Sequence, residues 1–287
     1  MKAIFSRELD AHFSSLTGNL FCAFVLLFAG IYTMAINLNG SYGNFEFVLS
    51  TMSFIFLITI PILTMRVIAE ERRQRTDQLL YSLPLSMGKI VLGKYFALLT
   101  VLAVPVGIMA LYPLVLSMYG NMNLATSYSA VIGFFLLGAA LIAIGMFISS
   151  LTENQGLAAG FCFVVLLVNY FLPSLAEYMP KTATGSLVAL AAAVLVFGVI
   201  LFFFTKNVVL SATVTVALEA VLFVCYSAFG ASFEGLFPNI MKKLSVFDQF
   251  NPFVNGVFDV VSVVYFLTVS AVFVYLTVQS LEKRRWS

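Results

Sequence analysis

Long apolar runs recur along the whole chain and are separated by short polar stretches. A helix needs about 20 apolar residues to cross the hydrocarbon core of a bilayer, and these runs are close to that length. The runs are continuous, whereas the strands of a membrane β-barrel alternate apolar and polar positions. The pattern therefore predicts an all-α, polytopic helical membrane protein with about eight hydrophobic segments. The segments are 20–38, 47–67, 95–118, 129–150, 156–173, 186–204, 208–229 and 258–280.

Three stretches outside these runs are long enough to form structure of their own. Residues 1–18 are predicted to form an interfacial helix, 66–94 a cytoplasmic loop, and 230–257 an external interfacial segment. In the last of these, Pro238 is placed to begin a helix. Its apolar face is expected to hold Ile240, Met241, Leu244, Phe247 and Phe250. We treat residues 1–287 as a single transmembrane domain.

The N-terminal segment separates its side chains as an amphipathic helix does. Its apolar set is Ile4, Phe5, Leu9 and Phe13, and its polar set is Arg7, Glu8 and Asp10. We expect the polar set to face water, with His12, the only histidine, at the surface beside it. The acids in this segment argue against a secretory signal peptide.

Composition strengthens the membrane assignment. The chain has 287 residues, 61% of them hydrophobic and 10% charged, whereas soluble domains carry roughly a quarter charged residues. The mean hydropathy is +1.03. The net charge of +2 gives no reason to expect nucleic acid as a partner. Cys22, Cys162 and Cys225 each lie in an apolar run without a CxxC pair, so we interpret them as small buried side chains.

The distribution of Lys and Arg predicts the orientation. With eight spans, both termini, the 66–94 loop and the 205–207 turn share one side, which carries nearly all the basic residues. The other side has Lys181, Lys242 and Lys243, together with acids such as Glu46. Both termini are therefore predicted to be cytoplasmic. We favour two full spans over a re-entrant pair for 186–204 and 208–229, because each run is long enough to cross.

The 66–94 loop holds the most specific pattern. A charged helix is predicted to leave the second span, a turn follows at Leu83-Pro84, and Ser86 is a suitable N-cap for the next helix. A simple positive anchor explains the arginines. It does not explain the paired acids Glu70 and Glu71 or the run from Thr76 to Leu80.

This loop resembles the coupling region of ABC-2 type permeases, especially the branch associated with gliding motility and copper-accessory transport. Residues 1–17, 149–155 and 247–286 are also similar to that family. Arg75 and Gln78 depart from it, standing where a glycine and a glutamate are common. The resemblance implies a type V exporter-like fold with six core spans plus the extra pair in 186–229. The matching loop residues are Thr64-Met65-Arg66, Ala69-Glu70-Glu71, Thr76, Leu79-Leu80, Pro84, Ser86 and Gly93-Lys94.

The resemblance further implies a bacterial plasma-membrane exporter whose ATPase is a separate chain that binds ATP and Mg²⁺. It also implies a second permease copy or a sister permease, and the external segment leaves room for an extracytoplasmic accessory protein. The sequence itself has no GxxxxGK[ST] phosphate loop, metal cluster or catalytic motif, so no cofactor or enzyme activity is expected in this chain. The residues expected to couple to the ATPase are Glu70, Glu71, Arg72, Arg73, Thr76, Asp77, Leu79, Leu80 and Glu153.

Glu219 is the only carboxylate that we place deep within a predicted span. An ionisable group there is costly, so it is either functional, as a proton, cation or substrate site, or a hydrogen-bonded group that ties helices together. The functional interpretation supports an alternative, a secondary transporter with Glu219 as its coupling acid. A membrane scaffold is a third hypothesis. The small-residue pairs Gly156/Gly160 and Gly145/Ser149 are expected to pack within the chain.

Overall fold

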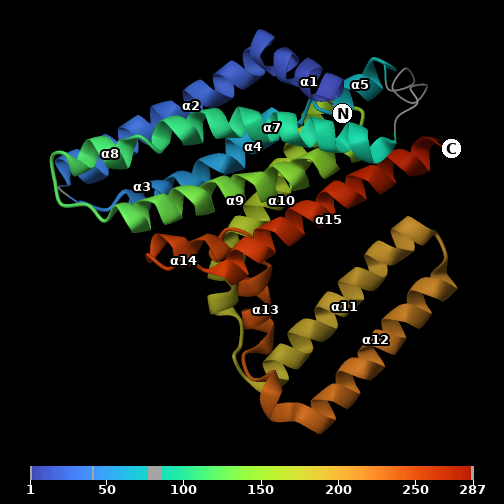
Figure 1. Cartoon of the computed structure of the whole chain (residues 1–287). Helices are drawn as coiled ribbons and strands as arrows, with labels where there is room; N and C mark the ends of the chain where they lie inside the picture. Colours follow the sequence, from blue (N-terminus) through green and yellow to red (C-terminus); the bar gives the residue numbers. More distant parts are fainter. Residues whose placement is uncertain (1, 41, 77–85, 286–287) are drawn as a thin grey trace. The chain divides into compact units, whose positions relative to one another are not determined.

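The structure is a computed structural model that describes residues 2–40, 42–76 and 86–285. Helices make up most of these residues and no strand occurs among them, which confirms the all-α prediction (Figure 1). The helices are α1 (Lys2–Ser14), α2 (Leu16–Thr33), α3 (Phe45–Met52), α4 (Phe56–Thr64), α5 (Ala69–Arg73), α7 (Met87–Met109), α8 (Tyr112–Ser117), α9 (Leu124–Leu151), α10 (Gln155–Tyr178), α11 (Ala183–Thr205), α12 (Val208–Phe229), α13 (Leu236–Leu244), α14 (Asn251–Val254) and α15 (Val260–Arg285).

Within the described residues, 7 helical stretches are long and apolar enough to cross a membrane. Some combine two elements, since a π-helical turn extends α2 and a short 3₁₀ turn joins α3 to α4. The remaining predicted segment, 186–204, lies in α11, whose Ala183–Val199 part is apolar but shorter. Every predicted segment is thus helical. The stretches are Leu16–Asn39, Phe45–Arg73, Met87–Ser117, Leu124–Leu151, Gln155–Tyr178, Val208–Ala228 and Val260–Arg284.

The chain divides into two compact units. Unit 1 comprises Met1–Tyr170 and Gln249–Ser287, and unit 2 comprises Phe171–Asp248. The extra hydrophobic pair found in the sequence falls in unit 2. The description of the chain as a single domain remains a prediction.

Helix α9 forms the centre of unit 1 and packs against α4, α7 and α15. Glycines on α9 allow these close approaches, because a Cβ at Gly138 would overlap Leu102 and one at Gly145 would overlap Thr64. The Phe134 ring of α9 stacks on Phe56 of α4 with ring centroids 4.4 Å apart. The core therefore holds α4 and α7, the helices that lead into and out of the 66–94 loop.

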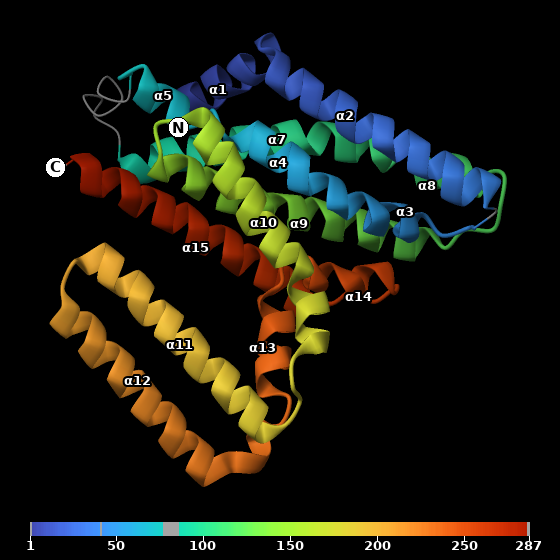
Figure 2. The ribbon, with the colours of Figure 1, turned by 180° about the vertical axis from the view of Figure 1, so that it is seen from behind.

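The start of α1 and the end of α15 lie at the same end of unit 1 as α5 (Figures 1 and 2). This agrees with the predicted sharing of one side by the termini and the 66–94 loop, and the assignment of that side to the cytoplasm remains a prediction. Helix α7 begins at Met87, directly after Ser86, as predicted.

The N-terminal helix differs from the prediction in length and in orientation. Helix α1 ends at Ser14, because Ser15 has an extended conformation and separates it from α2. Ile4, Glu8 and His12 are buried, and their spacing of four residues puts them on one face, toward α7. The prediction that Glu8 faces water and His12 lies at the surface is therefore wrong: His12 is only 7% exposed.

Unit 2 contains the α11–α12 hairpin. Lys206 at the turn is left-handed, with φ of 50°, and the Asn207 side chain caps α12 by accepting from the Leu210 N–H at 3.2 Å. With 23 and 22 residues, both helices have the length of a membrane span. The interpretation of the pair as two full spans remains a prediction.

The predicted helix near Pro238 is present as α13, with Pro238 in its first turn, where the missing N–H costs nothing. Its predicted apolar face is too long. The helix ends at Leu244 because Ser245 is extended, so Phe247 and Phe250 are not on it. Phe250 instead belongs to unit 1, where its ring lies 6.1 Å from that of Phe134.

Replacing Gly145 with valine is expected to lower the free energy of unfolding by about 1–3 kcal/mol, because the new side chain overlaps the buried Thr64 side chain. Unfolding of the detergent-purified protein by heat or denaturant measures this change.

Gly160→Val is the matched control. A Cβ at Gly160 would meet nothing within 4 Å among the described residues, so the prediction that this glycine packs within the chain is wrong. Only a helix-propensity change of a few tenths of a kcal/mol is expected there. Equal effects of the two valines would contradict the close approach of α4 and α9.

Candidate functional site

The start of α5 is fixed by one buried hydroxyl, that of Ser149 near the end of α9. Its Oγ accepts hydrogen bonds from the backbone N–H groups of Ile68 at 3.3 Å and Ala69 at 3.2 Å. It also lies 3.2 Å from the Met65 carbonyl, to which it can donate. These are backbone groups that lack helical partners where α4 ends and α5 begins. Ser149 therefore ties this junction to α9, which confirms the intrachain role predicted for the Gly145/Ser149 pair.

Arg72 forms the second attachment of α5 to α9. Its guanidinium is buried and donates from Nη1 to the Ser150 carbonyl at 2.6 Å, at the negative end of the α9 helix. Nη2 donates to Glu153 Oε1 at 3.2 Å, and Arg284 of α15 lies 3.6 Å from the same carboxylate. Ser280 of α15 also donates to the Ser150 carbonyl at 3.5 Å. Arg72 thus joins α5 to the α9–α10 loop and to the end of α15.

A buried lysine forms a third attachment, on the opposite flank of α5. Lys94 of α7 is 2% exposed, and its Nζ lies 3.0 Å from Glu8 Oε1, 2.8 Å from Glu71 Oε1 and 3.0 Å from the Val67 carbonyl. The ammonium thus donates hydrogen bonds to Glu8 and to the Val67 carbonyl and forms an ion pair with Glu71. Arg7 bonds the same carboxylates, at 2.7 Å from Glu8 and 3.0 Å from Glu71.

We call Lys94, Arg7, Glu8 and Glu71 the Lys94 cluster. It contains two cations and two carboxylates from helices α1, α5 and α7. A buried ammonium is very costly unless it is paired and hydrogen-bonded, so the cluster requires all three helices to be in place. A polar cleft of about 380 Å³ lies beside it, between α1 and α5.

The cluster and its burial shift the pKa of two groups on α1. Burial has the largest effect on Glu8 and alone would raise its pKa, but Lys94 and Arg7 outweigh it, so the pKa lies below 4.5. Burial is also the largest effect on His12 and holds its pKa below 6.5, despite Glu8 nearby. For both groups, the pKa in the folded state lies below the pKa in the unfolded state. Their contribution to folding stability is therefore present at a pH above the unfolded-state pKa, and it is lost as the pH falls through the folded-state pKa.

On and just after α5, one acid is paired locally, whereas two arginines have no ion-pair partner among the described residues. Glu70 is held by Arg66 through two hydrogen bonds of 2.7 and 3.0 Å. Arg73 and Arg75, by contrast, are exposed, and no described residue forms an ion pair with either. Arg75 has a left-handed backbone with φ of 57°, which turns the chain at the end of the helix. Two guanidinium groups are thus presented outward beside the cleft.

The predicted coupling residues differ in their contacts. Glu71, Arg72 and Glu153 attach α5 to other helices, and Glu70 is paired locally with Arg66. Arg73 faces outward, while Thr76 is partly buried and bonded to the Glu71 carbonyl. Asp77, Leu79 and Leu80 lie outside the described residues. Their predicted role in coupling is untested.

Sequence reasoning missed Lys94, Glu8 and Ser149 as site residues. A signal existed for Lys94, since it is an ionisable residue that lies further than Lys89 into the apolar helix Met87–Met109. The sequence held no signal for Glu8, because the pattern of α1 does not show that Ile4 and Glu8 share the packed face. Nothing in the sequence distinguishes Ser149 from its neighbour Ser150.

Glu219 lies in α12 of unit 2, away from the coupling residues in sequence and in a different unit. Its Oε1 is buried and has no hydrogen-bond partner among the described residues. Glu46, predicted in an outer loop, is 6% exposed at the start of α3, where Ser127 Oγ donates to it at 3.3 Å.

Replacing Lys94 with methionine is expected to destabilise unit 1 by about 3–5 kcal/mol, because it leaves Glu8 and Glu71 facing each other with Arg7 alone. Unfolding in detergent measures the loss, and hydrogen exchange should show faster exchange in α1 and α5. Lys89→Met is the matched control on the same helix, since Lys89 is exposed. If both variants unfold alike, the cluster does not hold these helices.

Comparison with known proteins identifies the family. The profile of the family described as ABC-2 family transporter protein matches residues 29–190, more than half of the chain, including α5, Lys94 and the α9–α10 loop. No curated protein matches the chain. Within the described residues, no three His, Cys, Asp or Glu side chains come together as a metal site. The matched region and the apolar helices together show that the chain belongs to the ABC-2 family of transporter proteins.

Proposed function

We propose that this ABC-2 permease is the membrane subunit of an ATP-driven exporter, and that α5 receives the movement of a separate nucleotide-binding subunit. That subunit would bind ATP and Mg²⁺ on the cytoplasmic side, where its closure would push on the permease. The substrate is not specified by any of these features.

The attachment of α5 on two flanks supports the proposal most strongly. Ser149 and Arg72 bind it to the end of α9, and Glu71 binds it through Lys94 to α7 and α1. A short helix held at one point would pivot when pushed. Because α5 is held to separate spans on each flank, a push on it would instead be passed to those spans.

The exposed arginines are the proposed contact between α5 and the nucleotide-binding subunit. Arg73 and Arg75 suit an acidic surface on the partner, because a guanidinium forms paired hydrogen bonds with a carboxylate. Asp77, Leu79 and Leu80 follow directly in sequence and are proposed to extend the contact, with the leucines at its apolar centre. Glu153 is exposed enough to add a second contact.

The remaining parts of the proposal follow from the resemblance in sequence. They are membership of the gliding-motility and copper-accessory branch, location in a bacterial plasma membrane with cytoplasmic termini, and pairing with a second copy or a sister permease. An extracytoplasmic accessory protein would dock on the segment 230–257.

Reversing both exposed charges, Arg73→Glu with Arg75→Glu, is expected to weaken binding of the nucleotide-binding subunit on the order of a hundredfold, because like charges then meet across the interface. The tagged chain is purified from its native membrane in mild detergent. Co-eluting subunits and their ATP hydrolysis are then measured.

The control is Lys206→Glu, which reverses another exposed cation predicted on the same side of the membrane. It should retain the ATPase subunit and its activity. If the double variant does so too, or if no nucleotide-binding chain co-elutes with the wild type, the proposal fails. Glu71 is a poor choice for this test, since its replacement would also break the Lys94 cluster.

The observation that favours the secondary-transporter alternative is Glu219 Oε1, which is buried without a hydrogen-bond partner in the part of the chain that the structure describes. Glu219→Gln removes the titratable group and keeps the shape. Because Glu219 makes no coupling contact, we expect ATP hydrolysis by the purified complex, and its pH dependence, to stay unchanged. An altered pH dependence would assign Glu219 a proton- or cation-binding role.

A further inference from the structure

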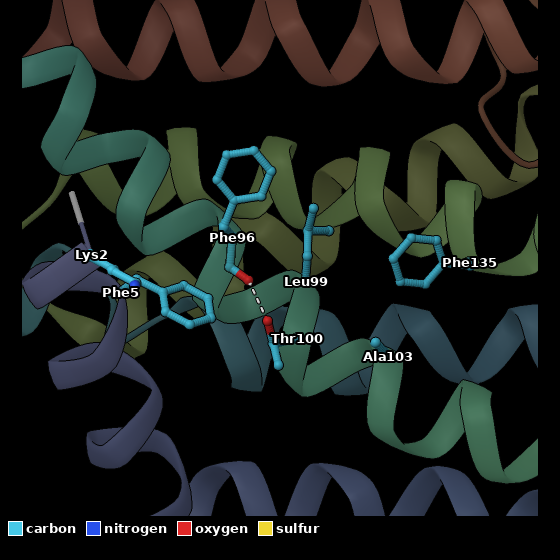
Figure 3. Close-up of a pocket in the computed structure, with 7 residues that line it drawn as sticks. All are labelled: Lys2, Phe5, Phe96, Leu99, Thr100, Ala103 and Phe135. Atoms are coloured by element: carbon cyan, nitrogen blue, oxygen red, sulfur yellow. Dashed lines mark hydrogen bonds between the residues drawn. The ribbon is translucent and has the colours of Figure 1, made fainter.

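A groove of about 730 Å³ lies on unit 1 where α1, α7 and α9 meet. Figure 3 shows Lys2 and Phe5 of α1 at one end and Ala103 and Phe135 at the other, with Phe96 and Leu99 of α7 between them. Along α7 the lining extends from Phe96 to Ala103, which corresponds to roughly 10 Å of helix. The groove is therefore elongated and follows a membrane span.

The walls of the groove are almost entirely apolar, as a binding site for a hydrocarbon chain requires. Apart from Lys2, the only lining side chain with a polar atom is Thr100, and its hydroxyl donates to the Phe96 carbonyl at 2.9 Å. The hydroxyl proton is therefore already donated, so apart from Lys2 the lining side chains offer no free hydrogen-bond donor to a ligand. Phe96 is 42% exposed even though it lies on a packed helix. An acyl chain matches both the shape and the chemistry.

The end of the groove at α1 carries a positive charge. Lys2 is exposed, and no described residue forms an ion pair with it. It is also the first residue of α1, so the positive end of the helix dipole lies at the same place. The acids nearest in sequence do not neutralise it, since Glu8 is taken up by Lys94 and Arg7. A cation at the end of an apolar groove complements an anionic amphiphile.

Packing of α1 fixes this arrangement. Ile4 is buried against Met87 and Ile90 of α7, so the face of α1 that includes Lys2 and Phe5 lies over the groove. The same helix belongs to the Lys94 cluster through Arg7 and Glu8. Helix α1, which begins at Lys2, starts at the end of unit 1 that carries α5, where lipid head groups would be.

We propose that this groove binds an anionic phospholipid, with the phosphate on Lys2 and one acyl chain against Phe5, Phe96 and Phe135. The lipid would hold α1 against α7. The site does not depend on the transport function proposed above, since it follows from the groove and its charge.

The test uses the delipidated full chain in detergent, titrated with phosphatidylglycerol or with phosphatidylcholine of the same acyl chains. Native mass spectrometry counts bound lipid, and thermal unfolding reports stabilisation, since a ligand of the folded state raises the unfolding temperature. We expect saturable binding of phosphatidylglycerol and a higher unfolding temperature than with phosphatidylcholine. Inorganic phosphate alone should give neither effect, because it lacks the chain.

Two variants separate the head group from the acyl chain. Lys2→Gln should weaken phosphatidylglycerol binding about fivefold and abolish the preference over phosphatidylcholine. Ala103→Phe should fill the groove and reduce binding of both lipids. The controls are Lys206→Gln, an exposed cation elsewhere, and Ala23→Phe, an exposed alanine on α2, and both should behave as the wild type.

Three outcomes would overturn the proposal. Equal binding of the two lipids by the wild type would exclude a head-group site. Retention of the preference by Lys2→Gln would place the site elsewhere. Conversion of a dimer to a monomer by Ala103→Phe, with no change in lipid binding, would show that a second copy of the chain occupies the groove instead.

Discussion

The position of α5 depends on the burial of one ammonium group. Lys94 is almost inaccessible to solvent, and its three partners come from α1, α5 and the α4–α5 junction. Removing an ammonium from water costs several kcal/mol, so a Lys94 without these partners would be strongly unfavourable. The requirement acts in both directions. Helix α7 can pack in its observed place only while α1 and α5 supply carboxylates, and those helices are held there by the same charge.

The attachments to α9 restrict α5 in a different way. The Ser149 hydroxyl and the Arg72 guanidinium bind backbone groups, which cannot change rotamer to follow a moving partner. The ion pair between Arg72 and Glu153 contributes less, because the Glu153 side chain is 68% exposed and solvent screens the attraction. Backbone contacts on one flank and a closed ion cluster on the other leave α5 little freedom to rotate. A part that transmits force needs this property, which is why we place coupling here.

The sequence predicted the elements well and their contacts poorly. Continuous apolar runs identified the membrane helices, since that signal is local and strong. The faces of α1 and the length of the α13 face were predicted incorrectly, because the amphipathic pattern does not state which surface a helix packs on. Glu8 and His12 look solvent-exposed until α7 is placed beside them. Glu71 and Arg72 were named from a resemblance in sequence, whereas their partners lie more than twenty residues away or on other helices.

Helix α1 takes part in two sites: one of its faces contributes to the Lys94 cluster, and another lines the apolar groove. If the groove holds a lipid, binding there favours the docked position of α1, and the docked position is also what completes the cluster around α5. Two equilibria that share one helix are linked, so each must affect the other by the same free energy. Lipid composition would then change the stability of the coupling segment without any contact between lipid and ATPase.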